Sequence, residues 1–146
     1  MKTLWQDERR RELHDRISRL TPETKGLWGR MDAPQMVAHL LASVRMANGE
    51  LPTAMRRTPL RHSPLKQLII YVLPFPRGTP TARELQPAPR VWEEEVAELR
   101  AQLDRFVTRD RQGRWPIHPA FGPLSARGWG VLTYRHLDHH LRQFGA

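Results

Sequence analysis

The chain reads DAPQMVAHLLASVRMANG from Asp32 to Gly49, and this stretch decides the fold class. Asp32 is a residue type that caps helix N-termini, and Pro34 suits the first helical turn. Asn48 and Gly49 are typical of a helix end. Between these signals, apolar side chains cover most of the circumference of the predicted helix: Met36, Val37, Leu40, Leu41 and Val44. We therefore expect this helix to be buried on more than one side.

Three other segments, residues 7–20, 88–108 and 125–144, repeat apolar residues at the three- and four-residue spacings of an amphipathic helix. Ser125 is a good N-cap for the last of them. No segment is predicted to be a strand. The sequence thus predicts an all-α fold, a four-helix bundle, in one domain that spans residues 1–146.

The connection between the second and third of these helices is long and rich in proline. Residues 50–90 hold eight of the 13 prolines of the chain. Within it, Leu65 to Leu73 predicts one or two helical turns, and Pro74 to Thr81 predicts a loop. A connection of this length is expected to cross between two helices or to cover a site.

Composition excludes several classes of protein. The chain has no cysteine, which excludes a disulfide scaffold, a thiolate zinc site and a cysteine nucleophile. The longest apolar run, residues 68–75, contains Pro74 and is far shorter than the roughly 20 residues of a membrane span. The first residues lack the apolar core of a signal peptide. We expect a cytoplasmic protein that does not associate with membranes.

The formal net charge of +9 permits binding to nucleic acid or to another anionic surface. However, basic and aromatic residues do not alternate, and no nucleic-acid motif is present. A solvated, arginine-rich surface is the simpler interpretation. A nucleic acid is therefore not the expected partner, although a basic nucleic-acid-associated protein remains a third functional hypothesis.

Two histidines of the last helix form the main candidate site. His136 and His140 are four residues apart, so their rings project from one helix face about 40° apart. This face also carries Trp129 and is apolar. Buried imidazoles need partners, and a shared metal ion is one way to provide them. An alternative ligand pair is His136 and His139, which are three residues apart.

A third ligand is expected from another helix, and His39 in the second helix is the best candidate. Periodicity places His39 at the edge of the apolar arc, so the alternative is a hydrogen-bonded core histidine. Asp32 is expected to cap a helix, and Asp138 lies on the polar arc of the last helix. Trp129 and His118 are expected to line a pocket beside the metal.

Two stretches resemble the DinB/YfiT-like metalloprotein superfamily. Trp28 to Leu40 is similar to the second helix of that superfamily, and residues 118–145 are similar to an uncharacterised branch, as is Pro74 to Thr81. The resemblance implies a four-helix bundle in up-down-down-up order with a long crossover after the second helix. It also implies a divalent metal ion held by His39, His136 and His140.

The resemblance further suggests activities. Some members of that superfamily transfer low-molecular-weight thiols such as bacillithiol, mycothiol or glutathione, and one group isomerises maleylpyruvate. Three neutral imidazoles leave an open position on zinc, nickel or iron(II), as in catalytic sites. We therefore expect a metal-dependent thiol S-transferase or hydrolase acting on a small molecule. The alternative is a non-catalytic metal-binding or small-molecule-binding protein of a stress response. A homodimer is a further expectation.

Overall fold

The computed structural model describes residues 1–75 and 83–146. In this part of the chain there are five α-helices: α1 (Asp7–Ile17), α2 (Ala33–Ala47), α3 (Leu65–Tyr71), α4 (Trp92–Thr108) and α5 (Ala126–Gln143). Two short 3-10 helices, η1 (Pro59–Arg61) and η2 (Arg83–Leu85), and two short strands, β1 (Ile117–His118) and β2 (Gly122–Pro123), complete the elements. The predicted mainly helical character is confirmed.

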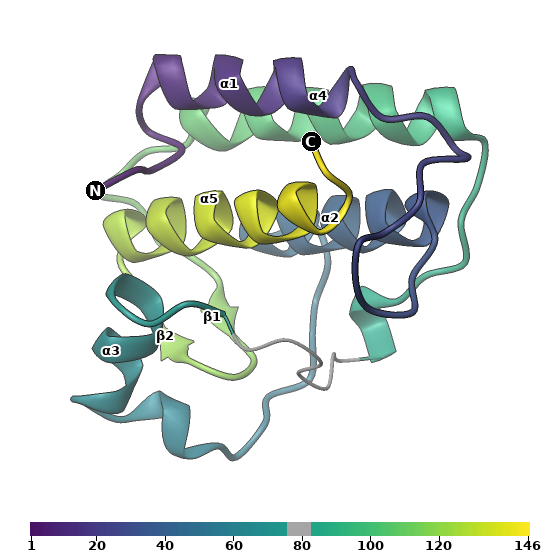
Figure 1. The fold of residues 1–146 in the computed structure, drawn as a ribbon. Helices are drawn as coiled ribbons and strands as arrows, with labels where there is room; N and C mark the ends of the chain where they lie inside the picture. The colour runs from purple at the N-terminus through teal and green to yellow at the C-terminus, as the bar shows by residue number, and fades with distance from the viewer. Residues whose placement is uncertain (76–82) are drawn as a thin grey trace.

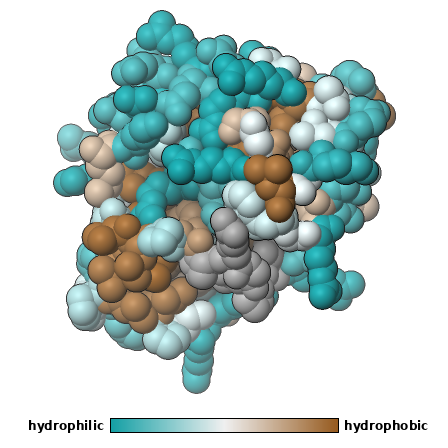
Figure 2. All heavy atoms as spheres, viewed as in Figure 1, coloured by the Kyte–Doolittle hydropathy of each residue, from teal (hydrophilic) through white to brown (hydrophobic). Residues whose placement is uncertain are grey.

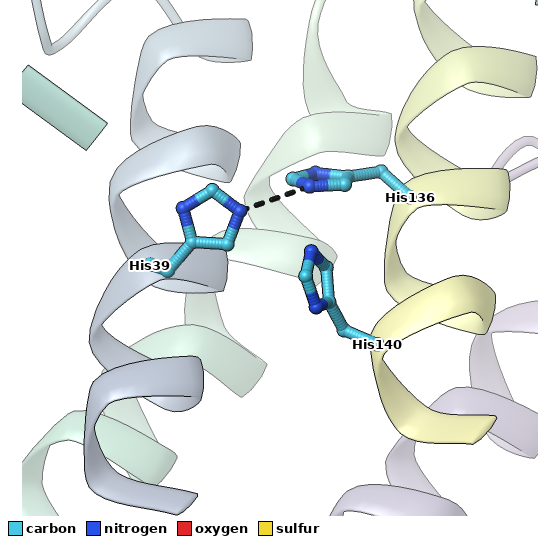
Figure 3. A group of neighbouring side chains, drawn as sticks. All are labelled: His39, His136 and His140. Atoms are coloured by element: carbon cyan, nitrogen blue, oxygen red, sulfur yellow. Dashed lines mark hydrogen bonds between the residues drawn. The ribbon is translucent and has the colours of Figure 1, made fainter. Parts of the chain in front are cut away.

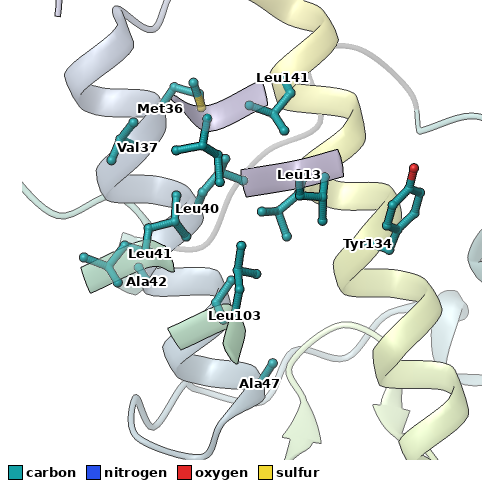
Figure 4. Packing of buried hydrophobic residues seen from close by; sticks show 14 of the residues in the cluster. Leu13, Met36, Val37, Leu40, Leu41, Ala42, Ala47, Leu103, Tyr134 and Leu141 are labelled. Carbon is teal, nitrogen blue, oxygen red and sulfur yellow. The ribbon is translucent and has the colours of Figure 1, made fainter. Parts of the chain in front are cut away.

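The four long helices pack lengthwise in two layers. Figure 1 shows α1 and α4 in the upper layer and α5 and α2 in the lower layer. Helix α2 contacts both α4 and α5, and α1 contacts the same two helices. Figure 4 shows the apolar side chains that fill the space between them, including Leu40 from α2, Leu13 from α1 and Leu103 from α4. This core surrounds α2 on several sides.

The start of α2 is fixed by its own sequence. The Asp32 carboxylate accepts a hydrogen bond from the Gln35 backbone N–H at 2.8 Å, and the Gln35 side chain accepts one from the Asp32 N–H at 3.0 Å. These two bonds form a capping box, which satisfies two N–H groups that a helix end leaves free. The predicted N-cap is therefore confirmed. Because the helix begins at this position, His39 lies on a side of α2 that faces the interior, and its exposed fraction is 4%.

A small second unit covers one side of α5. Helix α3 and the β1–β2 hairpin contribute Ile70 and Phe121 to a separate apolar cluster with Val131 and Leu132 of α5. Arg135 of α5 also donates hydrogen bonds to carbonyl groups at the end of α3, including that of Ile69 at 2.9 Å. Figure 1 shows α3 and the hairpin together below α5. Packing and hydrogen bonds thus hold α3 against α5, the helix that carries His136 and His140.

Some predictions about the elements need correction. The prediction of no strand is wrong, because His118 pairs with Gly122 in an antiparallel hairpin. The third predicted helix begins at Trp92 rather than near Ala88, because Pro89 disfavours helical geometry at the residue before it. Glu95 carries a charge that favours exposure, but it is 3% exposed, with Arg90 as an ion-pair partner.

Three other predictions about the fold are not tested by the described residues. The predicted loop from Pro74 to Thr81 lies largely outside the described residues. The up-down-down-up bundle and the single-domain boundary remain predictions. Among the described helices, none is long and apolar enough to cross a bilayer.

Candidate metal centre

Three histidine rings converge between α2 and α5. One ligand nitrogen from each of His39, His136 and His140 lies within 4.8 Å of the other two. The Nε2 atoms of His39 and His136 are 3.0 Å apart, and the three ring centroids are separated by 4.8 to 4.9 Å. Figure 3 shows the rings turned toward one shared space. The structure therefore brings together the three histidines that the sequence singled out.

The backbone explains why these rings meet. His136 and His140 are one turn apart on α5, so both project from the same face. Helix α2 contacts α5, and its His39 points into that contact. The four-residue spacing on α5 is thus the one that faces His39, and the alternative pairing through His139 does not enter the cluster.

Hydrogen bonds to the far side of two rings decide which nitrogen faces the cluster. The Nδ1 atom of His39 lies 2.7 Å from the Leu85 carbonyl oxygen, and the Nδ1 atom of His140 lies 2.8 Å from the Gln143 side-chain oxygen. Because both oxygens can only accept, each Nδ1 must carry the proton and donate. The Nε2 atoms of both rings are then left with a lone pair directed at the centre. This is the arrangement that orients histidine ligands in metal sites.

The nitrogen spacing suits a first-row metal ion. Two nitrogens that each lie about 2.0 Å from one tetrahedral ion are separated by roughly 3.3 Å. The distance of 3.0 Å between the Nε2 atoms of His39 and His136 is close to that value. The three ligand nitrogens lie within 4.8 Å of one another, so the rings have to turn closer together for all three to reach one ion.

Burial keeps these imidazoles neutral. Desolvation lowers the pKa of His39, while its hydrogen bond to Leu85 acts in the opposite direction. Desolvation, with the neighbouring histidines, lowers the pKa of His136 well below its usual value and that of His140 to about 3. A neutral imidazole is the form that binds a metal ion. The three rings are thus in the ligand form at neutral pH.

Gln143 connects the cluster to the segment before α2. Its side-chain nitrogen donates to the Trp28 carbonyl oxygen at 2.7 Å, which turns its oxygen toward His140. Gly29 has a φ of +84°, and a Cβ there would lie 2.4 Å from the Gln143 nitrogen. Only glycine fits this position without moving Gln143.

We expect Gln143→Ala to weaken metal binding about 10- to 100-fold, because His140 loses the acceptor that fixes its tautomer and orientation. Gly29→Ala should have a smaller effect in the same direction, since a Cβ there displaces the Gln143 amide. Titration of metal-free protein with Zn²⁺ against a chromophoric chelator measures both. Gln67→Ala, on the exposed side of α3, is the matched control and should leave the affinity unchanged. Equal affinities for Gln143→Ala and the unaltered chain would contradict the role of Gln143.

Trp129 and His118 lie against each other, with ring centroids 5.3 Å apart. Trp129 is 1% exposed and donates to the Pro116 carbonyl oxygen, so it belongs to the core. The Nδ1 atom of His118 accepts hydrogen bonds from the backbone N–H groups of Ala120 and Phe121. Desolvation lowers the pKa of His118 to about 4. That either residue lines a pocket stays a prediction.

Asp138 and Tyr134 are engaged away from the cluster. Asp138 forms ion pairs with Arg16 at 2.7 Å and with Arg142 at 3.0 Å, as its place on the polar arc of α5 predicted. The Tyr134 hydroxyl lies 3.4 Å from a Glu12 carboxylate oxygen. Neither group faces the three histidines.

Sequence reasoning missed two groups that support the ligands. Gln143 follows His140 by three residues on the same helix, so helical spacing alone could have indicated it. The Leu85 carbonyl has no such signal, because it lies 46 residues from His39, in the short 3-10 helix η2.

A model of one protein family matches residues 5–146, which is almost the whole chain. The chain belongs to this family. It is described as Protein of unknown function (DUF1569). No curated protein and no solved structure matches the chain. Membership of the DUF1569 family does not show a relationship to DinB/YfiT-like proteins, so that resemblance remains a prediction.

Proposed function

We propose that this chain binds one divalent metal ion through the Nε2 atoms of His39, His136 and His140. The observation that carries the proposal is the convergence of three ligand nitrogens within 4.8 Å, two of them on rings whose Nδ1 atoms are held by acceptors. The chemistry of the donors favours zinc, nickel or iron(II), since imidazole suits all three.

We further propose that the centre is catalytic, of the thiol S-transferase or hydrolase kind, and acts on a small molecule. Three protein ligands leave at least one coordination position free, which is typical of catalytic rather than structural sites. A divalent ion held there would supply Lewis acidity, which makes a bound thiol or water a stronger nucleophile near neutral pH. The chain itself contributes three neutral ligands, so that it does not offset the charge of the ion.

The scaffold proposal is a DinB-like four-helix bundle with a long crossover after α2. Its support is the lengthwise packing of α1, α2, α4 and α5 and the placement of α3 within the connection from α2 to α4. One ligand from the second helix and two from the last match the pattern that the resemblance implies.

A second candidate function is metal or small-molecule binding without catalysis. The observation that favours it is that two acid–base candidates on α5, Asp138 and Tyr134, are engaged elsewhere. Asp138 is paired with two arginines, and the Tyr134 hydroxyl is directed at Glu12.

Reconstituted protein distinguishes the two candidates. Zn²⁺-loaded and Ni²⁺-loaded protein is mixed with glutathione and 1-chloro-2,4-dinitrobenzene, and with 4-nitrophenyl acetate as a hydrolase probe. We expect a metal-dependent rate in one of the two assays that His140→Ala abolishes. A thermal shift with metal, no further shift with thiol, and no rate in either assay would favour the binding protein.

A further inference from the structure

Helix α3 presents an apolar surface to solvent. Leu65, Leu68 and Val72 follow one another at helical spacing, and their exposed fractions are 37%, 40% and 67%. Leu73, the next residue, is 38% exposed. Figure 2 shows apolar residues gathered over the part of the molecule where Figure 1 places α3. We call these four residues the α3 patch. Singly exposed apolar residues are ordinary, but a contiguous group of them marks an interaction site.

The α3 patch cannot turn inward. Ile70, on the opposite side of α3, is 1% exposed and packs with Phe121, Val131 and Leu132. The Arg135 guanidinium holds the carbonyl groups of Ile69, Ile70 and Leu73 from the other side. The interior side of α3 is therefore occupied, and its outer side chains remain at the surface.

Several cationic side chains lie on α3 or on segments that contact it, and the adjoining sequence lacks carboxylates. Residues 51–83 contain no Asp or Glu, and neither do residues 111–137, which include the hairpin. Lys66 donates to the Pro123 carbonyl oxygen, and Arg127 lies 6.0 Å from the centre of the Tyr71 ring. Arg61 lies beside Gly122 of the hairpin. Arg56 and Arg57, which precede η1, are exposed.

We propose that the α3 patch and the cations around it bind the surface of an anionic phospholipid bilayer. Aliphatic side chains enter the boundary between headgroups and acyl chains, and the neighbouring Arg and Lys side chains contact the anionic headgroups. The proposal departs from the expectation of no membrane association, because the sequence did not reveal which side chains of residues 65–73 face solvent.

Charge distinguishes this partner from two others. A second copy of the chain would oppose one cationic rim to another, which costs free energy, whereas an anionic bilayer complements that rim. A nucleic acid would also complement the charge, but it is bound through aromatic stacking and polar contacts rather than by protruding leucine and valine side chains. An anionic bilayer matches both the charge and the apolar character of the α3 patch.

Vesicle co-sedimentation tests the proposal with the full chain. We expect the protein to sediment with vesicles of equal phosphatidylglycerol and phosphatidylcholine, and much less with vesicles of phosphatidylcholine alone. The double variant Leu68→Glu/Val72→Glu should lower the bound fraction at least about ten-fold, because it removes apolar burial and adds two like charges at the membrane. Leu27→Glu, at a side chain that is 70% exposed elsewhere, is the matched control and should bind normally.

Further measurements test the role of charge and decide between partners. Replacement of Arg56 and Arg57 by glutamine should reduce vesicle binding while circular dichroism stays unchanged, and added salt should weaken binding by the unaltered chain. Absence of sedimentation with anionic vesicles overturns the proposal, as does sedimentation that the Leu68→Glu/Val72→Glu variant retains. A dimer in sedimentation equilibrium that this variant dissociates would identify a second copy as the occupant and would also overturn it.

Discussion

The variant His136→Ala/His140→Ala is expected to retain less than about a tenth of the metal that the unaltered chain binds, since a single remaining imidazole holds divalent ions weakly. The double change removes both ligands that α5 contributes and leaves His39 alone. Elemental analysis of protein purified without a histidine tag, after incubation with Zn²⁺ and gel filtration, measures the loss. The single variant His39→Ala should also lose most of the metal, because it removes the only ligand from α2.

His139→Ala provides the matched control for this experiment. His139 lies between the two ligands on α5, and its ring centroid is 5.1 Å from that of His140, but it is not one of the three converging histidines. We expect this variant to bind metal at the stoichiometry of the unaltered chain. Circular dichroism should show that every variant stays helical. If the double variant kept its full metal content, the three-histidine centre would be wrong.

The parts of the molecule that were predictable are those in which local signals and burial agree. Helix α2 begins with a capping box and is apolar around most of its surface. Its ends and its buried position could therefore both be predicted from the sequence. In α5, His136 and His140 stood out because polar rings on an apolar face require partners. The same reasoning was less secure for His39, because periodicity placed it at the margin of the buried arc, whereas contact with α5 buries it.

The parts that were not predictable depend on contacts between distant segments. The two-residue strands β1 and β2 have no periodicity to detect, and their pairing depends on the turn from Pro119 to Phe121. Glu95 carries a charge that favours exposure, yet it is buried beside Arg90 at the start of α4. Tertiary packing overrides the local preference in each case.

The exposed side of α3 illustrates the same limit. Hydrophobicity predicted a short helix over residues 65–73 but not which side chains would lie inside. Ile70 packs against α5, and Arg135 donates hydrogen bonds to the end of α3. These contacts fix the orientation of the helix, so that Leu68 and Val72 face outward. The sequence therefore shows that this segment is apolar, but the side chains that form its outer surface are identified only by how α3 packs.

The metal-free protein is expected to lose stability steeply between pH 6.5 and pH 5. Burial lowers the pKa of His140 to about 3 and that of His118 to about 4, whereas an unfolded histidine has a pKa near 6.5. Below pH 6.5 the unfolded chain therefore binds protons that the folded chain excludes, and the free energy of unfolding falls with pH. At pH 5 the loss is about 2 kcal/mol for each of these two histidines. The stabilisation is complete above pH 6.5 and declines until the folded pKa values are reached.

Urea unfolding of the protein in EDTA at pH 7 and at pH 5 measures this loss, because most carboxylates stay ionised over that interval. His118→Gln should reduce the difference between the two pH values by about 2 kcal/mol, since the substituted side chain no longer takes up a proton on unfolding. Saturating Zn²⁺ at pH 7 should add stability, because the ion binds the folded chain far better than the unfolded one. The same free energy of unfolding at both pH values would show that the buried histidines are not held neutral, and their assignment as ready metal ligands would fail with it.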